Sequence, residues 1–263
     1  MAPQAKDCGA GRLPMTTPFP IEGAIDMKSR TATLPERAYI AAQGKAPTDA
    51  SRGRAGSVYS MGKRVLDAAG AVVLLVVLSP LLLAAAALVR LSGPGPVLFR
   101  QVRIGRHEVP FTMFKLRTMK VGCDNSAQRD LNIRELRGED TRDGDGIFKI
   151  AGDPRITKGG ALLRRYSIDE LPQLINVVRG EMSLVGPRPS LPWEVELFTP
   201  EQRRRHDCLP GMTGLWQVSG RNRLSMTEML ALDVAYAEAR SFSLDLSILL
   251  RTPRAVLSGK DTR

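Results

Sequence analysis

Residues 68–89 read AAGAVVLLVVLSPLLLAAAALV, and no charged side chain interrupts them. Leu, Val and Ala dominate the run, and a helix of roughly 22 residues at about 1.5 Å per residue is long enough for a hydrocarbon core of about 30 Å. Ser79-Pro80 lies in the middle of the run, where proline removes a backbone donor and bends a helix. The sequence therefore predicts a membrane-inserted helix over residues 59–91 with a break at Ser79-Pro80.

Basic residues flank this segment on both sides, so the positive-inside rule gives no orientation: Lys63 and Arg64 precede it, and Arg90 and Arg100 follow it. Two topologies stay open. A kinked helix that spans the bilayer is one, because neighbouring helices can satisfy the carbonyl that proline frees. A re-entrant helix that returns to its starting face is the other, and it explains the break and the symmetric charge together. A signal peptide is disfavoured, since the run is too long and no cleavage pattern follows it.

The composition limits the remaining chain to one domain and an arm. Residues 1–58 mix Pro, Ala, Gly, Thr, Ser and Arg without apolar periodicity, which predicts a disordered basic arm. The net charge of +11 over 263 residues indicates an anionic partner, such as nucleic acid, lipid or a phosphorylated substrate. An aromatic content of 5% argues against single-stranded nucleic acid, whose bases stack on exposed rings.

Residues 92–263 are expected to form an α+β domain that is mostly helical. Apolar alternation predicts two strands of a small sheet at 97–103 and 111–119. Polar residues 122–146 suggest a helix and a mobile loop over the site. Helical periodicity predicts further helices at 160–165, 171–178, 226–240 and 244–257. Some of these helices should lie along the bilayer surface, and the last one either does so or packs on the core.

Carboxylates and arginines gather in the second half of the chain. No phosphate loop is present, so a nucleotide would need other groups. Arginine forks match phosphate oxygens, which suits a diphosphate. Of the adjacent pair Asp169 and Glu170, one carboxylate could attack phosphorus while the other holds Mg²⁺, which shields the negative charge of the substrate.

Both motifs also have purely structural interpretations. Ser167 and Glu170 fit a capping box, in which Asp169 would only favour the helix dipole. Gly186-Pro187-Arg188-Pro189 could be only a rigid turn, although two prolines would also fix Arg188 for a phosphate. The residues alone leave these alternatives open.

Several ordered blocks resemble the bacterial sugar transferases, also called monotopic phosphoglycosyl transferases. They are Lys63-Arg-Val-Leu-Asp67, Ser79-Pro80, Phe114-Lys-Leu-Arg-Thr-Met119, Asp153-Pro-Arg-Ile-Thr157, Ile168-Asp-Glu-Leu-Pro-Gln-Leu-Ile-Asn176, Gly180-Glu-Met-Ser-Leu-Val-Gly-Pro-Arg-Pro189 and Pro210-Gly-Met-Thr-Gly-Leu-Trp-Gln-Val-Ser-Gly-Arg221. The similarity runs from about Gly62 to the C-terminus. With one apolar segment before the catalytic region, the chain looks like a short form that initiates exopolysaccharide synthesis.

The resemblance implies a re-entrant helix and a catalytic domain on the cytoplasmic face of the bacterial inner membrane. It implies transfer of sugar 1-phosphate from a UDP-sugar, with glucose or galactose, to undecaprenyl phosphate with release of UMP. Membrane lipid is an expected partner, nucleic acid is not, and a homodimer stays open.

By the same resemblance, Asp169 is the nucleophile and Glu170 the catalytic ligand of Mg²⁺. Arg188, with Pro187 and Pro189, belongs to the nucleotide-binding region. Further phosphate contacts are expected from Lys115, Arg117 and Arg155. The alternative is a non-catalytic scaffold or regulator of polysaccharide export whose arginines bind only lipid head groups, and in which Asp169 is dispensable.

Overall fold

The computed structural model describes residues 52–122, 126–137, 139, 141 and 153–257, all within the compact unit Thr33–Arg263. The first helix, α2, begins at Arg52 and therefore includes the last residues of the expected arm. The rest of that arm, residues 1–51, lies outside the described residues.

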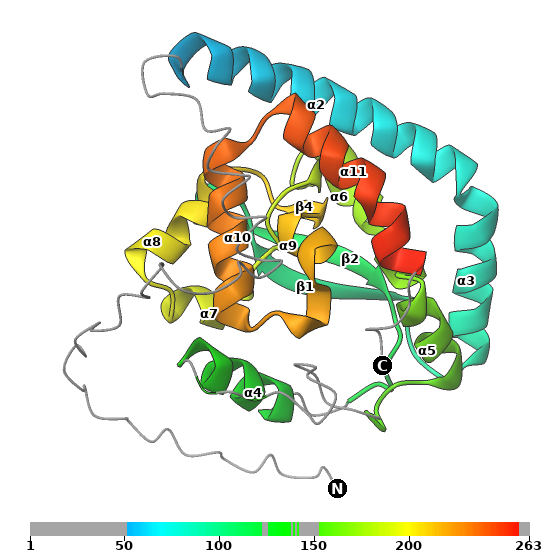
Figure 1. Cartoon of the computed structure of the whole chain (residues 1–263). Coiled ribbons are helices and arrows are strands. Elements are labelled where there is room, and N and C mark those ends of the chain that lie inside the picture. The colour runs from blue at the N-terminus through cyan, green and yellow to red at the C-terminus, as the bar shows by residue number, and fades with distance from the viewer. Residues whose placement is uncertain (1–51, 123–125, 138, 140, 142–152, 258–263) are drawn as a thin grey trace, which may run out of the picture. The chain divides into compact units, whose positions relative to one another are not determined.

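The apolar run forms two helices, α2 (Arg52–Val77) and α3 (Ser79–Leu91), which meet at an angle of 64°. The break is where the Ser-Pro pair predicted it, and its chemistry is local. Pro80 has no N–H for the carbonyl of Val76, four residues earlier, and the hydroxyl of Ser79 donates to that carbonyl instead at 2.8 Å. Among the described helices none is both long and apolar enough to cross a membrane alone, whereas this bent pair qualifies by length and composition. Figure 1 shows α2 and α3 along one side of the fold.

Charged side chains in the first half of α2 attach this helix to the domain. Asp245 in α11 (Phe242–Leu257) accepts bonds from Lys63 at 2.9 Å and Tyr59 at 2.8 Å. One turn later, Asp67 accepts a bond from the hydroxyl of Ser183 at 2.6 Å. The block Lys63-Arg-Val-Leu-Asp67 thus holds the helix in place through buried polar contacts.

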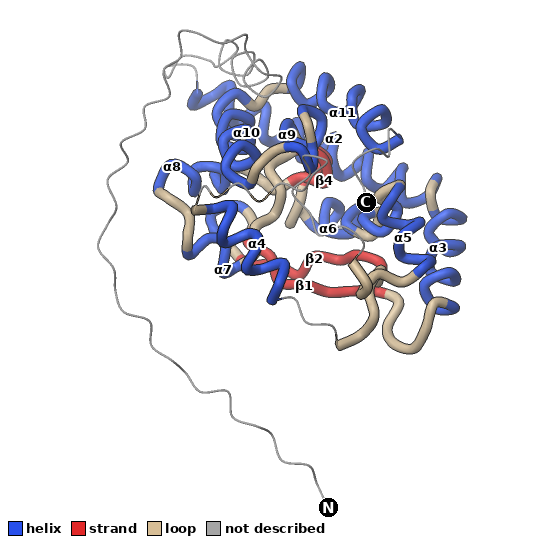
Figure 2. Tube along the Cα trace, turned by 60° about the horizontal axis from the view of Figure 1, so that its bottom comes forward, coloured by secondary structure: helices blue, strands red, loops and turns tan. Residues whose placement is uncertain are grey.

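The expected hairpin is present. Strand β1 (Leu98–Ile104) pairs antiparallel with β2 (Pro110–Leu116), in a register that sets Leu98 opposite Leu116. A second sheet was not predicted: β3 (Ser183–Val185) and β4 (Gly211–Thr213) pair in parallel. Its strands are only three residues long, too short to show alternation. Figure 2 shows the hairpin in red, with β4 apart from it.

The predicted longer helices form close to their expected bounds, and an α+β class with mostly helical content is confirmed. They are α4 (Ser126–Leu136), α5 (Lys158–Arg165), α6 (Gln173–Arg179), α10 (Met226–Ala239) and α11. Gly180 ends α6 with φ +84°, a left-handed conformation that glycine adopts without strain. Short helices were missed, because one turn shows no period: α7 (Pro192–Glu196), α8 (Pro200–Arg203), α9 (Leu215–Ser219) and the 3₁₀ turns η2 (Arg106–Glu108), η3 (Ile168–Glu170), η4 (Arg204–Asp207) and η5 (Arg221–Arg223).

The main core lies between the C-terminal helices and the short parallel sheet. Tyr236 of α10 and Ile248 of α11 are fully buried there against Val185 of β3. The opposite face of α11 is exposed and apolar at Leu246 and Leu250. This helix therefore packs on the core, as one interpretation predicted, while its outer face stays available to an apolar environment.

Candidate active site

The Asp-Glu pair lies on the 3₁₀ turn η3, between helices α5 and α6. Ser167, just before it, has φ +54°, a left-handed conformation that is strained for a residue other than glycine. The Ser167 side chain makes no cap bond, and Glu170 turns to a different partner. The capping-box interpretation is therefore wrong. The strained turn exists here without the local stabilisation that a cap would provide.

Glu170 is paired with Lys115 from strand β2. The Lys115 ammonium lies 2.7 Å from Oε1 of Glu170, and the two side chains are 25% and 34% exposed. Residues 55 positions apart are thus brought together, as the sequence predicted for one site. The partial exposure leaves both groups accessible to a bound molecule.

Asp169 is buried beside this pair, with 8% of its surface exposed. Burial and then the negative charge of Glu170 raise the pKa of Asp169 above the usual value for aspartate, while Lys115 and Arg164 act against this rise. A weakly hydrated carboxylate close to cations is more reactive toward an electrophile than a fully solvated one.

The pKa of Glu170 shifts in the opposite direction to that of Asp169. Burial opposes its ionisation, but the charges of Lys115, Arg188 and Arg221 together outweigh burial, so the pKa of Glu170 falls below its usual range. Adjacent carboxylates with opposite pKa shifts are typical of catalytic pairs with divided roles.

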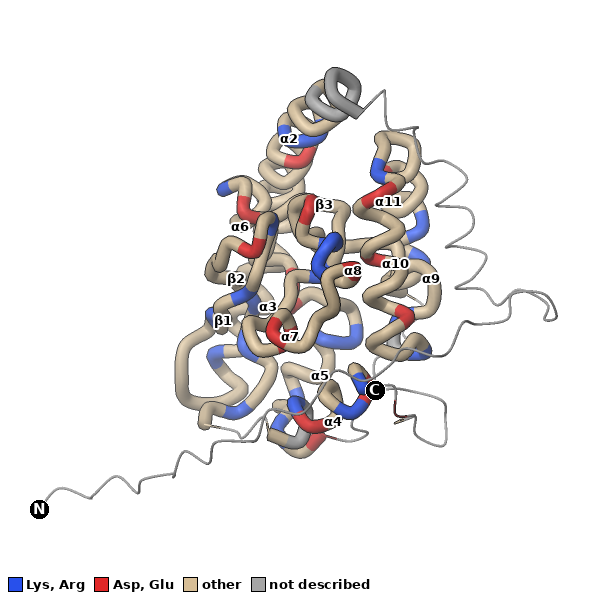
Figure 3. The backbone as a smooth tube through the Cα atoms, turned by 90° about the vertical axis from the view of Figure 1, so that its left-hand side faces the viewer, with Lys and Arg blue, Asp and Glu red and all other residues tan. Residues whose placement is uncertain are grey.

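Both carboxylates face an open cleft of about 2140 Å³. Its wall is strongly basic, with cations from β1, β2, α4, α5, η5 and the loops that follow β2, α4 and β3: Arg100, Arg103, Lys115, Arg117, Lys120, Arg129, Arg155, Lys158, Arg164, Arg188 and Arg221. Figure 3 marks basic positions in blue along the chain. Such a wall favours a ligand with several negative charges.

Arg188 is presented to this cleft by a fixed backbone. The carbonyl of Pro187 accepts from the N–H of Gly211 at 2.8 Å, and the carbonyl of Pro189 accepts from Arg103 at 3.0 Å. The guanidinium of Arg188 itself makes no hydrogen bond or ion pair with another described residue. A rigid loop with an unengaged arginine agrees with the expectation of a phosphate contact.

Arg117 and Arg155 line the cleft, but their guanidinium groups are occupied. Arg117 is 8% exposed and donates to the carbonyl of Val89 in the last turn of α3 and to those of Gly93 and Pro94 in the loop that follows. Arg155 forms a bidentate pair with Asp153, and this hydrogen bonding is the main cause of the lowered pKa of Asp153. Both arginines thus have structural partners, and their roles as phosphate contacts stay predictions.

Arg103 and Arg164 are among the cleft arginines that were not assigned to the site from the sequence. Arg103 is 6% exposed, and its guanidinium binds Gln101 and the carbonyl of Pro189 without a carboxylate partner among the described residues. Arg164 lies in the last turn of α5, and its positive charge acts to lower the pKa of Asp169. The alternation of β1 could have indicated Arg103, since it lies on the same face of the strand as Gln101.

A metal would rely on few protein ligands. Within the described residues no three His, Cys, Asp or Glu side chains gather as a metal site. Glu170 offers hard carboxylate oxygen at the cleft, and Mg²⁺ commonly takes one or two carboxylates and completes its shell with phosphates and water. The available donor fits this mode.

Comparison with known proteins gives consistent matches over the bent helix pair and the domain that follows it. Residues 58–259 match the family described as bacterial sugar transferase. The uncharacterized sugar transferase EpsL of Bacillus subtilis is 44% identical over 195 residues, covering 74% of this chain and 87% of EpsL. ExoY, an exopolysaccharide production protein of Rhizobium meliloti, is 41% identical, covering 74% and 85%. The UDP-glucose:undecaprenyl-phosphate glucose-1-phosphate transferase of Caulobacter vibrioides is also 41% identical, covering 74% and 70%.

Proposed function

The chain belongs to the bacterial sugar transferase family, and from this premise we propose that it transfers a sugar 1-phosphate from a UDP-sugar to undecaprenyl phosphate. The name of the Caulobacter relative contains both substrates, with glucose as the sugar. Galactose is the second sugar to test. The observation that carries the proposal is the pair of Asp169, buried, and Glu170, bound to Lys115, at a basic cleft.

Asp169 acts first, as the nucleophile. One of its carboxylate oxygens attacks the phosphorus that carries the sugar, the bond from this phosphorus to the bridging oxygen breaks, and UMP leaves with that oxygen. The product on the protein is an acyl phosphate that bears the sugar. Burial supports this role because it limits the water that stabilises the free carboxylate and hydrolyses the intermediate.

The lipid carrier completes the transfer. An oxygen of undecaprenyl phosphate attacks the same phosphorus, the bond to Asp169 breaks, and the carboxylate is regenerated. Polyprenyl diphosphate-sugar is released. Two displacements at one phosphorus leave the free enzyme unchanged after each cycle.

The other cleft residues bind and orient the charged groups. Arg188 is well placed to bind phosphate oxygens, because its backbone is held and its guanidinium is unengaged by described residues. Lys115 keeps Glu170 ionised. Glu170 would hold Mg²⁺, which supplies positive charge to the diphosphate.

We also propose that α2 and α3 enter the inner membrane from the cytoplasmic side and return to it. Lys63 near the start of α2 binds Asp245 of the domain, and Val89 near the end of α3 is buried against the same domain. Both ends are thus attached to one folded unit. The exposed apolar residues between them, such as Val76 and Leu83, fit a lipid environment.

Release of UMP tests the reaction. Purified protein in nanodiscs is incubated with Mg²⁺, undecaprenyl phosphate and UDP-glucose or UDP-galactose. Wild type should release UMP with one of them, and Asp169→Asn should not, while Asp207→Asn, an exposed carboxylate, should behave as wild type. Equal activity of Asp169→Asn would show that Asp169 is not the nucleophile. No release of UMP by folded wild type with either sugar would favour the scaffold alternative.

A further inference from the structure

Every backbone polar group of Pro187-Arg188-Pro189 has a partner. The two proline carbonyls are held by Gly211 and Arg103. The two prolines have no N–H, so the tripeptide has one amide proton, on Arg188, and it is donated to Oδ2 of Asp233 at 3.3 Å. The carbonyl of Arg188 accepts from Nη2 of Arg205 at 2.6 Å. This complete use of the backbone fixes the position from which the Arg188 side chain extends.

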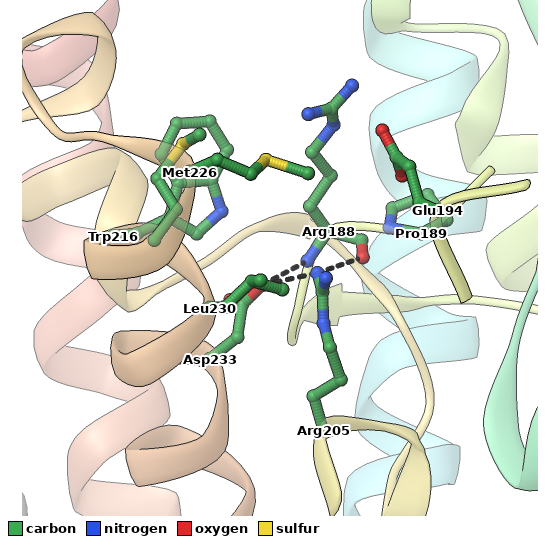
Figure 4. A pocket seen from close by; sticks show the side chains of 9 residues that line it. Arg188, Pro189, Glu194, Arg205, Trp216, Met226, Leu230 and Asp233 are labelled. Atoms are coloured by element: carbon green, nitrogen blue, oxygen red, sulfur yellow. Dashed lines mark hydrogen bonds and ion pairs between the residues drawn. The ribbon is translucent and has the colours of Figure 1, made fainter. Parts of the chain in front are cut away.

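Asp233 and Arg205 also bind each other. Their carboxylate and guanidinium are 2.5 Å apart, and the two side chains are only 2% and 3% exposed. Asp233 comes from α10 and Arg205 from η4, so the pair joins two elements behind the loop. Figure 4 shows Arg188 extending away from this pair, while its backbone lies against it.

A buried ion pair is not by itself an efficient source of stability. Removing both charges from water is expensive, and apolar residues of similar size often serve as well or better. Oδ1 of Asp233 and Nε of Arg205 have no partner among the described residues. Both residues line a cavity of about 10 Å³, which is room for one water. The specific contribution of this pair is that it binds both backbone polar groups of one residue, the N–H and the C=O of Arg188.

We propose that Arg205 and Asp233 are positioning residues that hold Arg188 in place for the phosphate groups of the substrate. This inference rests on the proposed function of Arg188. Neither Arg205 nor Asp233 lines the cleft, so neither would contact the substrate directly. They act through the N–H and C=O of Arg188.

The test replaces both charges together, because a single replacement would leave a buried charge unpaired. The variant is Arg205→Met with Asp233→Leu. The same two elements offer a matched control in Arg204 and Glu238, an ion pair of 2.9 Å whose side chains are 53% and 27% exposed. Arg204→Met with Glu238→Leu removes the same charges without touching the loop.

Amide hydrogen exchange gives a readout that does not depend on activity. The difference between overlapping peptides with and without Arg188 reports on one amide, because its neighbours have none. In the buried-pair variant this amide should exchange at least about 10-fold faster, while the surface-pair control stays like wild type. Unchanged exchange of Arg188 in a folded buried-pair variant would overturn the proposal. General loss of protection across α10 would also overturn it, since that result indicates only a structural role.

A double-mutant cycle connects the pair to substrate binding. In wild type, Arg188→Ala should raise KM for the UDP-sugar by at least about 10-fold. In the buried-pair variant it should add less than about 3-fold, because Arg188 is already misplaced. Equal effects in both backgrounds would overturn the positioning role. If wild type releases no UMP, the proposed function fails, and hydrogen exchange alone decides whether the pair holds the loop.

Discussion

The ammonium of Lys115 lies 2.7 Å from a carboxylate oxygen of Glu170, next to the buried carboxylate of Asp169. The positive charge of Lys115 thus acts on both carboxylates. It keeps Glu170 ionised, and it moderates the repulsion that Glu170 exerts on Asp169.

Replacing Lys115 by Met should therefore disable the site without unfolding the protein. Loss of the cation raises the pKa of both carboxylates, so the nucleophile and the proposed metal ligand are each less ionised at neutral pH. We expect kcat for UMP release to fall by about 100-fold or more, with little change in melting temperature. Surface variant Arg204→Met is the control. Near-normal activity of Lys115→Met would show that catalysis does not depend on Lys115.

Replacing Arg117 by Met should have the opposite effect to replacing Lys115, lowering stability rather than activity. Its guanidinium donates to three carbonyls in the last turn of α3 and the loop that follows, so Arg117→Met should cost about 2–3 kcal/mol of stability. We expect a lower melting temperature and an unchanged KM for the UDP-sugar in the protein that stays folded. A large rise in KM at an unchanged melting temperature would instead support the expectation from the sequence that Arg117 contacts a phosphate.

The bent helix pair predicts which side of the membrane its two ends face. Single cysteines at Ser60 and Ser92, in a background without the three natural cysteines, should both react with an impermeant reagent from the cytoplasmic side of oriented vesicles. Both ends are attached to one domain, so neither should react from the outside. Labelling of the two positions from opposite sides would show a spanning helix.

His206 predicts a pH dependence of stability. Burial and the nearby charge of Arg205 lower the pKa of His206 to about 4. As pH falls from about 6.5 toward 4, the unfolded chain takes up a proton that the folded protein does not, so this residue destabilises the fold by at most about 3 kcal/mol. Its influence fades as the pH rises above about 6.5.

Asp233 acts in the opposite sense over the same pH window, because burial raises its pKa to about 6. The comparison of wild type with His206→Gln isolates the histidine. The melting temperature of wild type should fall relative to the variant between pH 6.5 and 4. A constant difference over this range would show that His206 titrates normally.

The sequence predicted the features that depend on long patterns or on strong local chemistry. Alternation gave the hairpin, periodicity gave α10 and α11, and proline chemistry gave the bend before Pro80. The strands β3 and β4 were missed because three residues carry no pattern, and their pairing joins segments far apart in the chain.

The site shows the same division. Asp169, Glu170, Lys115 and Arg188 were named from motifs, and the structure brings them to one cleft. The hydrogen-bond partners of a side chain depend on the fold, so the sequence did not reveal that the Arg117 guanidinium donates to backbone carbonyls. The sequence also did not indicate that Asp233 accepts a hydrogen bond from the Arg188 amide, since the two residues are 45 positions apart.

The proposed mechanism requires Asp169 to carry the sugar phosphate during the reaction. Wild type is mixed with Mg²⁺ and the UDP-sugar in the absence of undecaprenyl phosphate, quenched, digested and examined by mass spectrometry. We expect one sugar phosphate on the peptide that contains Asp169, its disappearance when undecaprenyl phosphate is added, and none in Asp169→Asn. Release of UMP that requires undecaprenyl phosphate, with no modified peptide at any time, would contradict it and indicate direct transfer.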